Sequence, residues 1–125
     1  MKDNLIKALA RLASKQYQDL YMVHGTAEEY VLPEDLIEDV ASLCQLATKN
    51  HYKTTFTNDE HAALESMLIE IRGLDSDFWN VVGNNTLEHL VHKNPIWSDL
   101  RLSAEHVLNA LGVSANNFSP KTIDS

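Results

Sequence analysis

The chain contains a single cysteine, Cys44, and no long apolar run. One cysteine excludes an internal disulfide bond and any metal site built from several thiolates. The longest apolar runs extend over three or four residues, whereas a helix that spans a bilayer needs roughly 20. Charged residues also interrupt the N-terminus before the apolar block of a signal peptide can form, so we expect a cytoplasmic protein.

The motifs of common enzyme classes are absent as well. The chain has no HExxH metal motif, no glycine-rich phosphate loop and no G-x-S-x-G nucleophile turn. Cys44 shares one helical arc with Leu43 and Ala47, so we expect a small core side chain there rather than a nucleophile. We therefore predict that the protein is not an enzyme and needs no cofactor.

Basic residues are scarce. Ten Lys and Arg stand against eighteen Asp and Glu, which gives a formal net charge of −8. This charge disfavours nucleic acid and anionic membranes as partners, because both attract proteins through Lys and Arg. It favours a basic protein, whose encounter such a field accelerates. The alternative is that the charge only keeps the protein soluble.

Apolar residues recur at helical spacing along nearly the whole chain of 125 residues. The first stripe runs from Leu5 to Leu20 within an arc of about 140° and predicts one amphipathic helix of roughly 20 residues. We predict an all-α fold, a helical bundle of about four to six helices. Residues 1–112 should form a single helical domain, and residues 113–125 a flexible C-terminal tail.

Helix boundaries are marked by residues that favour them. Pro33 and Pro95 suit the first turn of a helix, where the missing N–H is harmless. Thr57 and Glu60 match a capping box, in which each residue satisfies the other's free N–H group at a helix start. Gly112 is a suitable C-terminal stop, so helices are expected to begin and end near these positions.

The segment from Val23 to Thr48 contains six acids and no Lys or Arg. Two of these acids lie in the connection before Pro33, and four fall on the arc opposite the apolar stripe of the following helix. Tyr21 and Tyr30 bracket the connection, and we expect both rings to be exposed anchors at an interface. The predicted partner-binding residues are Tyr21, Glu28, Glu29, Tyr30, Glu34, Asp35, Glu38 and Asp39.

Other acids and the histidines give weaker signals. A second acidic region extends from Asp59 to Asp77 with Arg72 as its one base. For both acidic regions, the alternative to partner binding is a solvated face.

His89 and His92 can face one way on a helix, but a zinc site needs a third and usually a fourth ligand. We predict that this pair binds no metal. Ligands recruited from other helices would have to be His61, His106 or Glu105.

A small, acidic, helical and cytoplasmic protein without a catalytic motif resembles the immunity proteins of bacterial polymorphic toxin systems, in particular those of contact-dependent growth inhibition. The resemblance covers the whole chain in size and character, and the stretch 21–35 is similar to the acidic loop-and-helix surfaces that they use. It implies toxin immunity: an inhibitor that acts by protein–protein interaction on a cognate basic toxin domain, often a nuclease that acts on tRNA or DNA.

Two other functions stay open on the sequence. One is a small cytoplasmic helical adaptor or regulator, and the other is a helical metal-dependent enzyme that uses His89 and His92. Metal analysis of the purified protein separates the enzyme from the other two.

Overall fold

The computed structural model describes residues 1–26, 28–49, 54–114, 118–120 and 123. Over these residues the chain forms α-helices and one π-helical turn, with no β-strand, which confirms the all-α class. Nowhere in these ranges is a helix both long and apolar enough to cross a membrane. The elements are α1 (Lys2–Ala13), α2 (Lys15–Gln18), the π-helical turn η1 (Asp19–Val23), α3 (Pro33–Ala47), α4 (Asn58–Arg72), α5 (Ser76–Gly83), α6 (Leu87–Lys93) and α7 (Pro95–Ala110).

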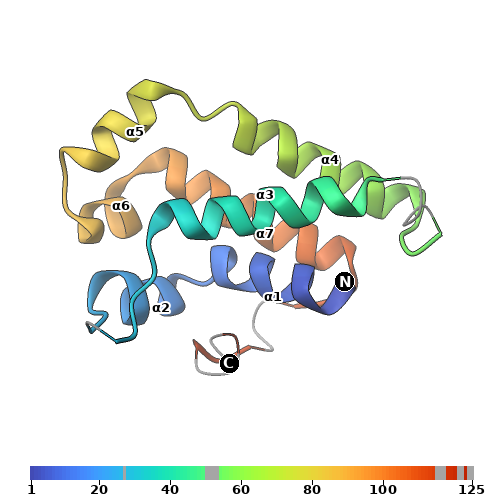
Figure 1. The fold of residues 1–125 in the computed structure, drawn as a ribbon, viewed down its shortest axis with the longest axis horizontal. Coiled ribbons are helices and arrows are strands. Elements are labelled where there is room, and N and C mark those ends of the chain that lie inside the picture. The colour runs from blue at the N-terminus through green and yellow to red at the C-terminus, as the bar shows by residue number, and fades with distance from the viewer. Residues whose placement is uncertain (27, 50–53, 115–117, 121–122, 124–125) are drawn as a thin grey trace.

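Four long helices form an antiparallel bundle. Helix α1 packs on α3 and α7, and α4 packs on the same two helices, so the four close into a ring. Neighbours in the ring run in opposite directions (Figure 1). Short elements join them at one end: α2 and η1 lead from α1 to α3, and α5 and α6 lead from α4 to α7 (Figure 1). Because η1 also packs on α6, the two connections support each other at that end.

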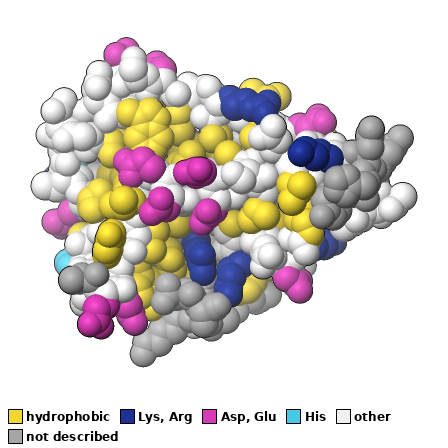
Figure 2. Space-filling view, viewed as in Figure 1, with side chains coloured by type: hydrophobic (Ala, Val, Ile, Leu, Met, Phe, Trp, Pro, Cys, Tyr) yellow, Lys and Arg dark blue, Asp and Glu magenta, His cyan; other side chains and the backbone are white. Residues whose placement is uncertain are grey.

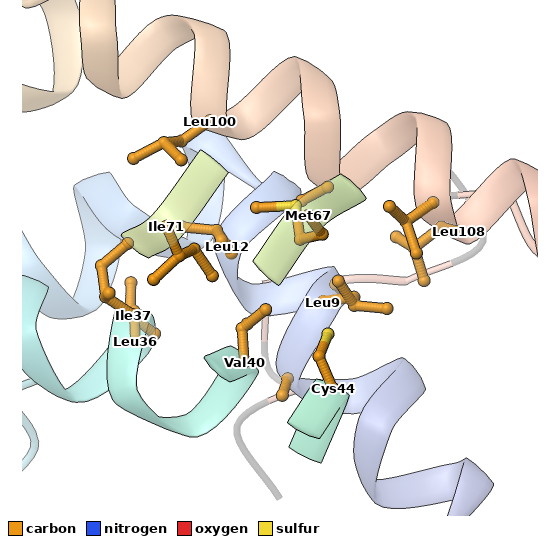
Figure 3. Close-up of a cluster of buried hydrophobic side chains, with 14 of the residues drawn as sticks. Leu9, Leu12, Leu36, Ile37, Val40, Cys44, Met67, Ile71, Leu100 and Leu108 are labelled. Atoms are coloured by element: carbon orange, nitrogen blue, oxygen red, sulfur yellow. The ribbon is translucent and has the colours of Figure 1, made fainter. Parts of the chain in front are cut away.

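The core lies on the axis of this ring. Figure 3 shows side chains from all four long helices that point toward one another, among them Leu9 of α1, Val40 of α3, Met67 of α4 and Leu100 of α7. Each of these four side chains is almost completely buried. Burial of a side chain of this size contributes roughly 1.5–3 kcal/mol to folding, so the apolar stripes are what hold the bundle together.

The sequence pattern had predicted one continuous first helix, but the helix breaks at Ser14. Ser14 adopts an extended backbone (φ −96°, ψ 107°), and its hydroxyl accepts a hydrogen bond from the Tyr17 N–H at 3.0 Å, which caps α2. The side-chain amide of Gln18 donates to the carbonyls of Arg11 and Leu12, at 3.1 and 2.7 Å, and so satisfies the open end of α1. Polar side chains thus replace the helical hydrogen bonds that the break removes.

This break corrects two expectations. The described residues contain seven α-helices and η1, more than the four to six predicted, because one expected helix is divided. Leu20 was expected on the buried stripe but is 44% exposed. The extended residue at position 14 and the wider π-helical turn change the phase of the apolar pattern, so the predicted stripe does not continue past the break.

The other boundaries agree with the sequence prediction. Pro33 and Pro95 are the first residues of α3 and α7, and Thr57 caps α4 in a complete capping box. Gly112 follows α7 with φ of 79°, a conformation that L side chains rarely adopt. Local side-chain chemistry therefore determines where α3, α4 and α7 begin and where α7 ends.

The C-terminal segment makes contact with α1. Phe118 packs against the core, Ile123 is buried, and the Arg11 side chain donates a hydrogen bond to the Ile123 carbonyl. Residues 115–117, 121–122 and 124–125 lie outside the described residues, so a flexible tail over 113–125 stays a prediction.

The capping box predicts how stability depends on pH. The hydrogen bond from the Thr57 N–H, 2.8 Å from Glu60 Oε1, holds the pKa of Glu60 below its ordinary value, with the Lys2 ammonium 3.6 Å away acting in the same direction. Because the folded pKa is depressed, the carboxylate's contribution to stability is present above the unfolded pKa and is lost as pH falls through the folded pKa.

We therefore expect Glu60→Gln to lower the free energy of unfolding by up to about 1 kcal/mol at pH 7 and to flatten its decline below pH 5. Urea unfolding at several pH values measures both effects. Glu65→Gln, an exposed carboxylate on the same helix, is the matched control and should keep the wild-type slope. Equal slopes in all three proteins would contradict this role for Glu60.

Candidate functional site

Helix α3 presents the four helical acids of the predicted surface. Its inner side buries Leu36, Ile37 and Val40, and the opposite side exposes all four carboxylates. The acids form two pairs at i, i+4 spacing, so each pair is separated by about 6 Å along the helix axis. The first acid of each pair lies in the first turn, where the positive end of the helix dipole favours anions. These residues are Glu34, Glu38, Asp35 and Asp39.

The loop before α3 is folded onto η1. The Thr26 hydroxyl accepts hydrogen bonds from the Glu28 and Glu29 N–H groups, at 3.3 and 3.0 Å, and the Thr26 N–H donates to the Glu29 carbonyl at 3.0 Å. The Val31 N–H donates to the carbonyl of Tyr21 at 2.9 Å. These hydrogen bonds give the described residues of the loop a defined shape, and both of its glutamates are exposed.

The two tyrosines differ from each other. Tyr30 is 60% exposed, as expected for an anchor at an interface. Tyr21 is 7% exposed, and its ring lies 4.9 Å from that of Tyr17, so the expectation of an exposed ring at position 21 is wrong. The reason is the π-helical turn, which directs this side chain into the bundle. The carbonyl of Tyr21 contacts the loop through its hydrogen bond with the Val31 N–H.

Exposed hydrophobic side chains accompany the acids. Leu32, which directly precedes α3, is 42% exposed. With Leu20 and Tyr30 it makes three of the seven large hydrophobic side chains that are exposed in the described residues. Figure 2 shows acidic side chains gathered over the first part of α3, with hydrophobic side chains on either side of them. We call the surface formed by Glu28, Glu29, Tyr30, Leu32, Glu34, Asp35, Glu38 and Asp39 the acidic face.

The acids of this face have no cationic partner within the described ranges. The ion pairs found there join Lys2 to Glu60 and His92 to Asp19. In the second acidic region two of the six acids are used in helix caps: Glu60 belongs to the capping box of α4, and the Asp75 carboxylate caps α5 through the Phe78 N–H at 2.9 Å. No described cation therefore neutralises the negative field of the acidic face.

The two candidate metal ligands lie beside a surface hollow of about 500 Å³. The Nε2 atom of His92 is 2.5 Å from Asp19 Oδ1, so this nitrogen is engaged with a carboxylate. Among the described residues, no three His, Cys, Asp or Glu side chains come close enough to hold a metal ion. His61, His106 and Glu105 are therefore not brought to the pair.

We expect the melting temperature to be the same with and without EDTA, because a protein without a structural metal has no metal-binding free energy to lose. Thermal unfolding followed by circular dichroism, before and after dialysis against the chelator, makes the measurement. A fall in melting temperature that zinc restores would contradict the prediction and favour the metal-dependent enzyme.

Cys44 is a core residue, as predicted. Its side chain is fully buried on α3, and burial raises the pKa of the thiol to about 12. A thiol of this kind is protonated at neutral pH and is a poor nucleophile.

Sequence reasoning missed the exposed positions of Leu20 and Leu32, since both belong to hydrophobic runs and no local signal separates them from core residues. Seven of the eight residues predicted to bind a partner are exposed, and Tyr21 is buried. Comparison of the chain with protein-family models, curated proteins and solved structures finds no match.

Proposed function

We propose that the protein is an immunity protein of a bacterial toxin system: a cytoplasmic inhibitor without catalytic activity that binds a basic toxin domain through the acidic face. The observation that carries the proposal is the set of six exposed carboxylates that have no described ion-pair partner and lie beside exposed Tyr30 and Leu32.

The negative charge of this surface indicates which class of protein it binds. A nuclease that binds nucleic acid uses Lys and Arg to contact phosphates. Carboxylates on α3 can replace those phosphates, because Arg pairs with carboxylate and phosphate in the same bidentate geometry. The inhibitor then occupies the substrate-binding surface of the toxin and needs neither turnover nor a cofactor.

The exposed hydrophobic side chains contribute a slow dissociation rate, which charge alone does not provide. Exposed charges act mainly on the association rate, whereas large side chains buried at the centre of an interface slow dissociation. Tyr30 is the side chain best placed for that role, because it is exposed within the acidic loop and the loop backbone is held by hydrogen bonds.

The direct test is a titration of the purified protein against the C-terminal domain of a secreted toxin encoded upstream of its gene. We expect a one-to-one complex whose dissociation constant rises with salt concentration. Absence of binding to every neighbouring toxin domain would exclude the proposal. An adaptor, by contrast, would bind a basic protein that is not a toxin.

A further inference from the structure

A buried polar cluster lies where the broken first helix meets α7. Gln18 is fully buried, and its side-chain amide makes four hydrogen bonds. Its nitrogen donates to the carbonyls at the end of α1, and its oxygen accepts from Trp97 Nε1 at 3.0 Å and from the Arg101 guanidinium at 3.4 Å. A saturated amide of this kind fixes α2 in one position, because any displacement leaves buried polar atoms without partners.

The same cluster holds η1 to α6. The Arg101 guanidinium also donates to the Val91 carbonyl of α6, and the Asp19 carboxylate at the start of η1 interacts electrostatically with Arg101. Asp19 in turn accepts a hydrogen bond from His92 of α6. Because a carboxylate oxygen can only accept, the Nε2 atom of His92 carries the hydrogen. Burial lowers the pKa of Arg101, and Asp19 opposes that shift.

η1 in turn positions the loop that carries Tyr30. The Val31 N–H bonds to the Tyr21 carbonyl of η1, and Gly25 lies directly against the same carbonyl. A Cβ atom at position 25 would stand 2.5 Å from the Tyr21 oxygen and 2.8 Å from the Glu29 oxygen, so only glycine allows this approach. The loop is therefore fixed to η1 by these contacts, and a movement of η1 also moves the loop.

Short elements need such support. Helix α2 has four residues and η1 has five, whereas isolated helices shorter than roughly 12 residues are marginal in water. Their conformation is set by tertiary contacts, and the contacts described above are polar and specific. π-Helical turns are rare in proteins, and those that occur are often found at functional sites. This agrees with a role for η1 beyond connecting two helices.

We propose that Asp19, His92 and Arg101 are positioning residues of the acidic face: they hold η1 against α6 and α7, and η1 holds the loop that presents Tyr30. The use of this loop for binding rests on the proposed function. The link from the cluster to the loop does not, because it can be measured in the free protein.

The test is amide hydrogen exchange of the full chain, followed by NMR, in His92→Ala and in His89→Ala. His89 lies one turn earlier on α6 and serves as the matched control, because its side chain has no such contact with η1. We expect His92→Ala to accelerate exchange of the Val31 amide about two- to fivefold, because the His92–Asp19 pair is about one third exposed and exposed pairs contribute little. His89→Ala should leave this amide at the wild-type rate.

A second variant, Asp19→Asn, should give the same local acceleration, because it removes the charge shared by His92 and Arg101. The proposal is overturned if neither variant changes exchange between residues 19 and 31, or if exchange accelerates equally in the four long helices. Toxin titrations separate the two proposals. Local acceleration without any toxin binding would refute only the immunity function, and toxin binding with unchanged exchange would refute only the positioning role.

Discussion

Trp97→Ala should lower the free energy of unfolding by about 3–5 kcal/mol, the largest effect that we expect of any single substitution. Trp97 is fully buried at the start of α7, and its indole N–H donates to Gln18 Oε1. The substitution opens a cavity in the bundle and also deprives the buried amide of one of its partners. Urea unfolding followed by circular dichroism measures the loss.

Trp79→Ala provides the matched control, since the chain has two tryptophans in different surroundings. Trp79 lies on the short helix α5, is only partly buried and packs edge-on against Phe78. We expect it to cost less than half as much as Trp97→Ala, because less apolar surface is lost from the interior. Equal costs at the two positions would contradict the placement of Trp97 in the centre of the fold.

The second large effect concerns association with a basic toxin domain. We expect the double variant Glu34→Lys, Glu38→Lys to associate at least about tenfold more slowly at low salt, and its rate to respond less to added salt. Both side chains are exposed on α3, so folding should change by less than about 1 kcal/mol per site, including the unfavourable charge at the helix start. Stopped-flow or surface-based kinetics give the rates.

A control of equal charge tests whether position matters. Glu65→Lys, Asp99→Lys changes the net charge by the same amount at exposed sites on α4 and α7, away from the acidic face. We expect it to retain most of the wild-type association rate. If both double variants slow association equally, the total charge of the protein attracts the partner and the acidic face has no special role.

The long helices follow from local sequence chemistry. Pro33, Thr57 and Pro95 act within one turn of themselves, so their effect on the helix start needs no knowledge of the fold. Exposure of the α3 acids follows in the same way, because a periodic apolar stripe determines the opposite side of the helix.

The break at Ser14 could not be predicted in this manner. The apolar periodicity continues through position 14, and serine is tolerated in many helices. What stabilises the broken form is the bonding of Gln18 to Trp97 and Arg101, which are about 80 positions further along the chain. The burial of Tyr21 and the exposure of Leu20 depend on this break, so the sequence pattern alone gave the wrong prediction of burial for both side chains.

The measurement that tests the central claim most directly is growth of bacteria that express a candidate toxin domain encoded by a neighbouring gene, with and without this protein. We predict that the wild-type protein restores growth, that Glu34→Lys, Glu38→Lys restores it poorly, and that Glu65→Lys, Asp99→Lys restores it as the wild type does. Equal protection by the two double variants would contradict binding through the acidic face. Failure of the wild-type protein to protect against any neighbouring toxin domain would contradict the immunity function itself.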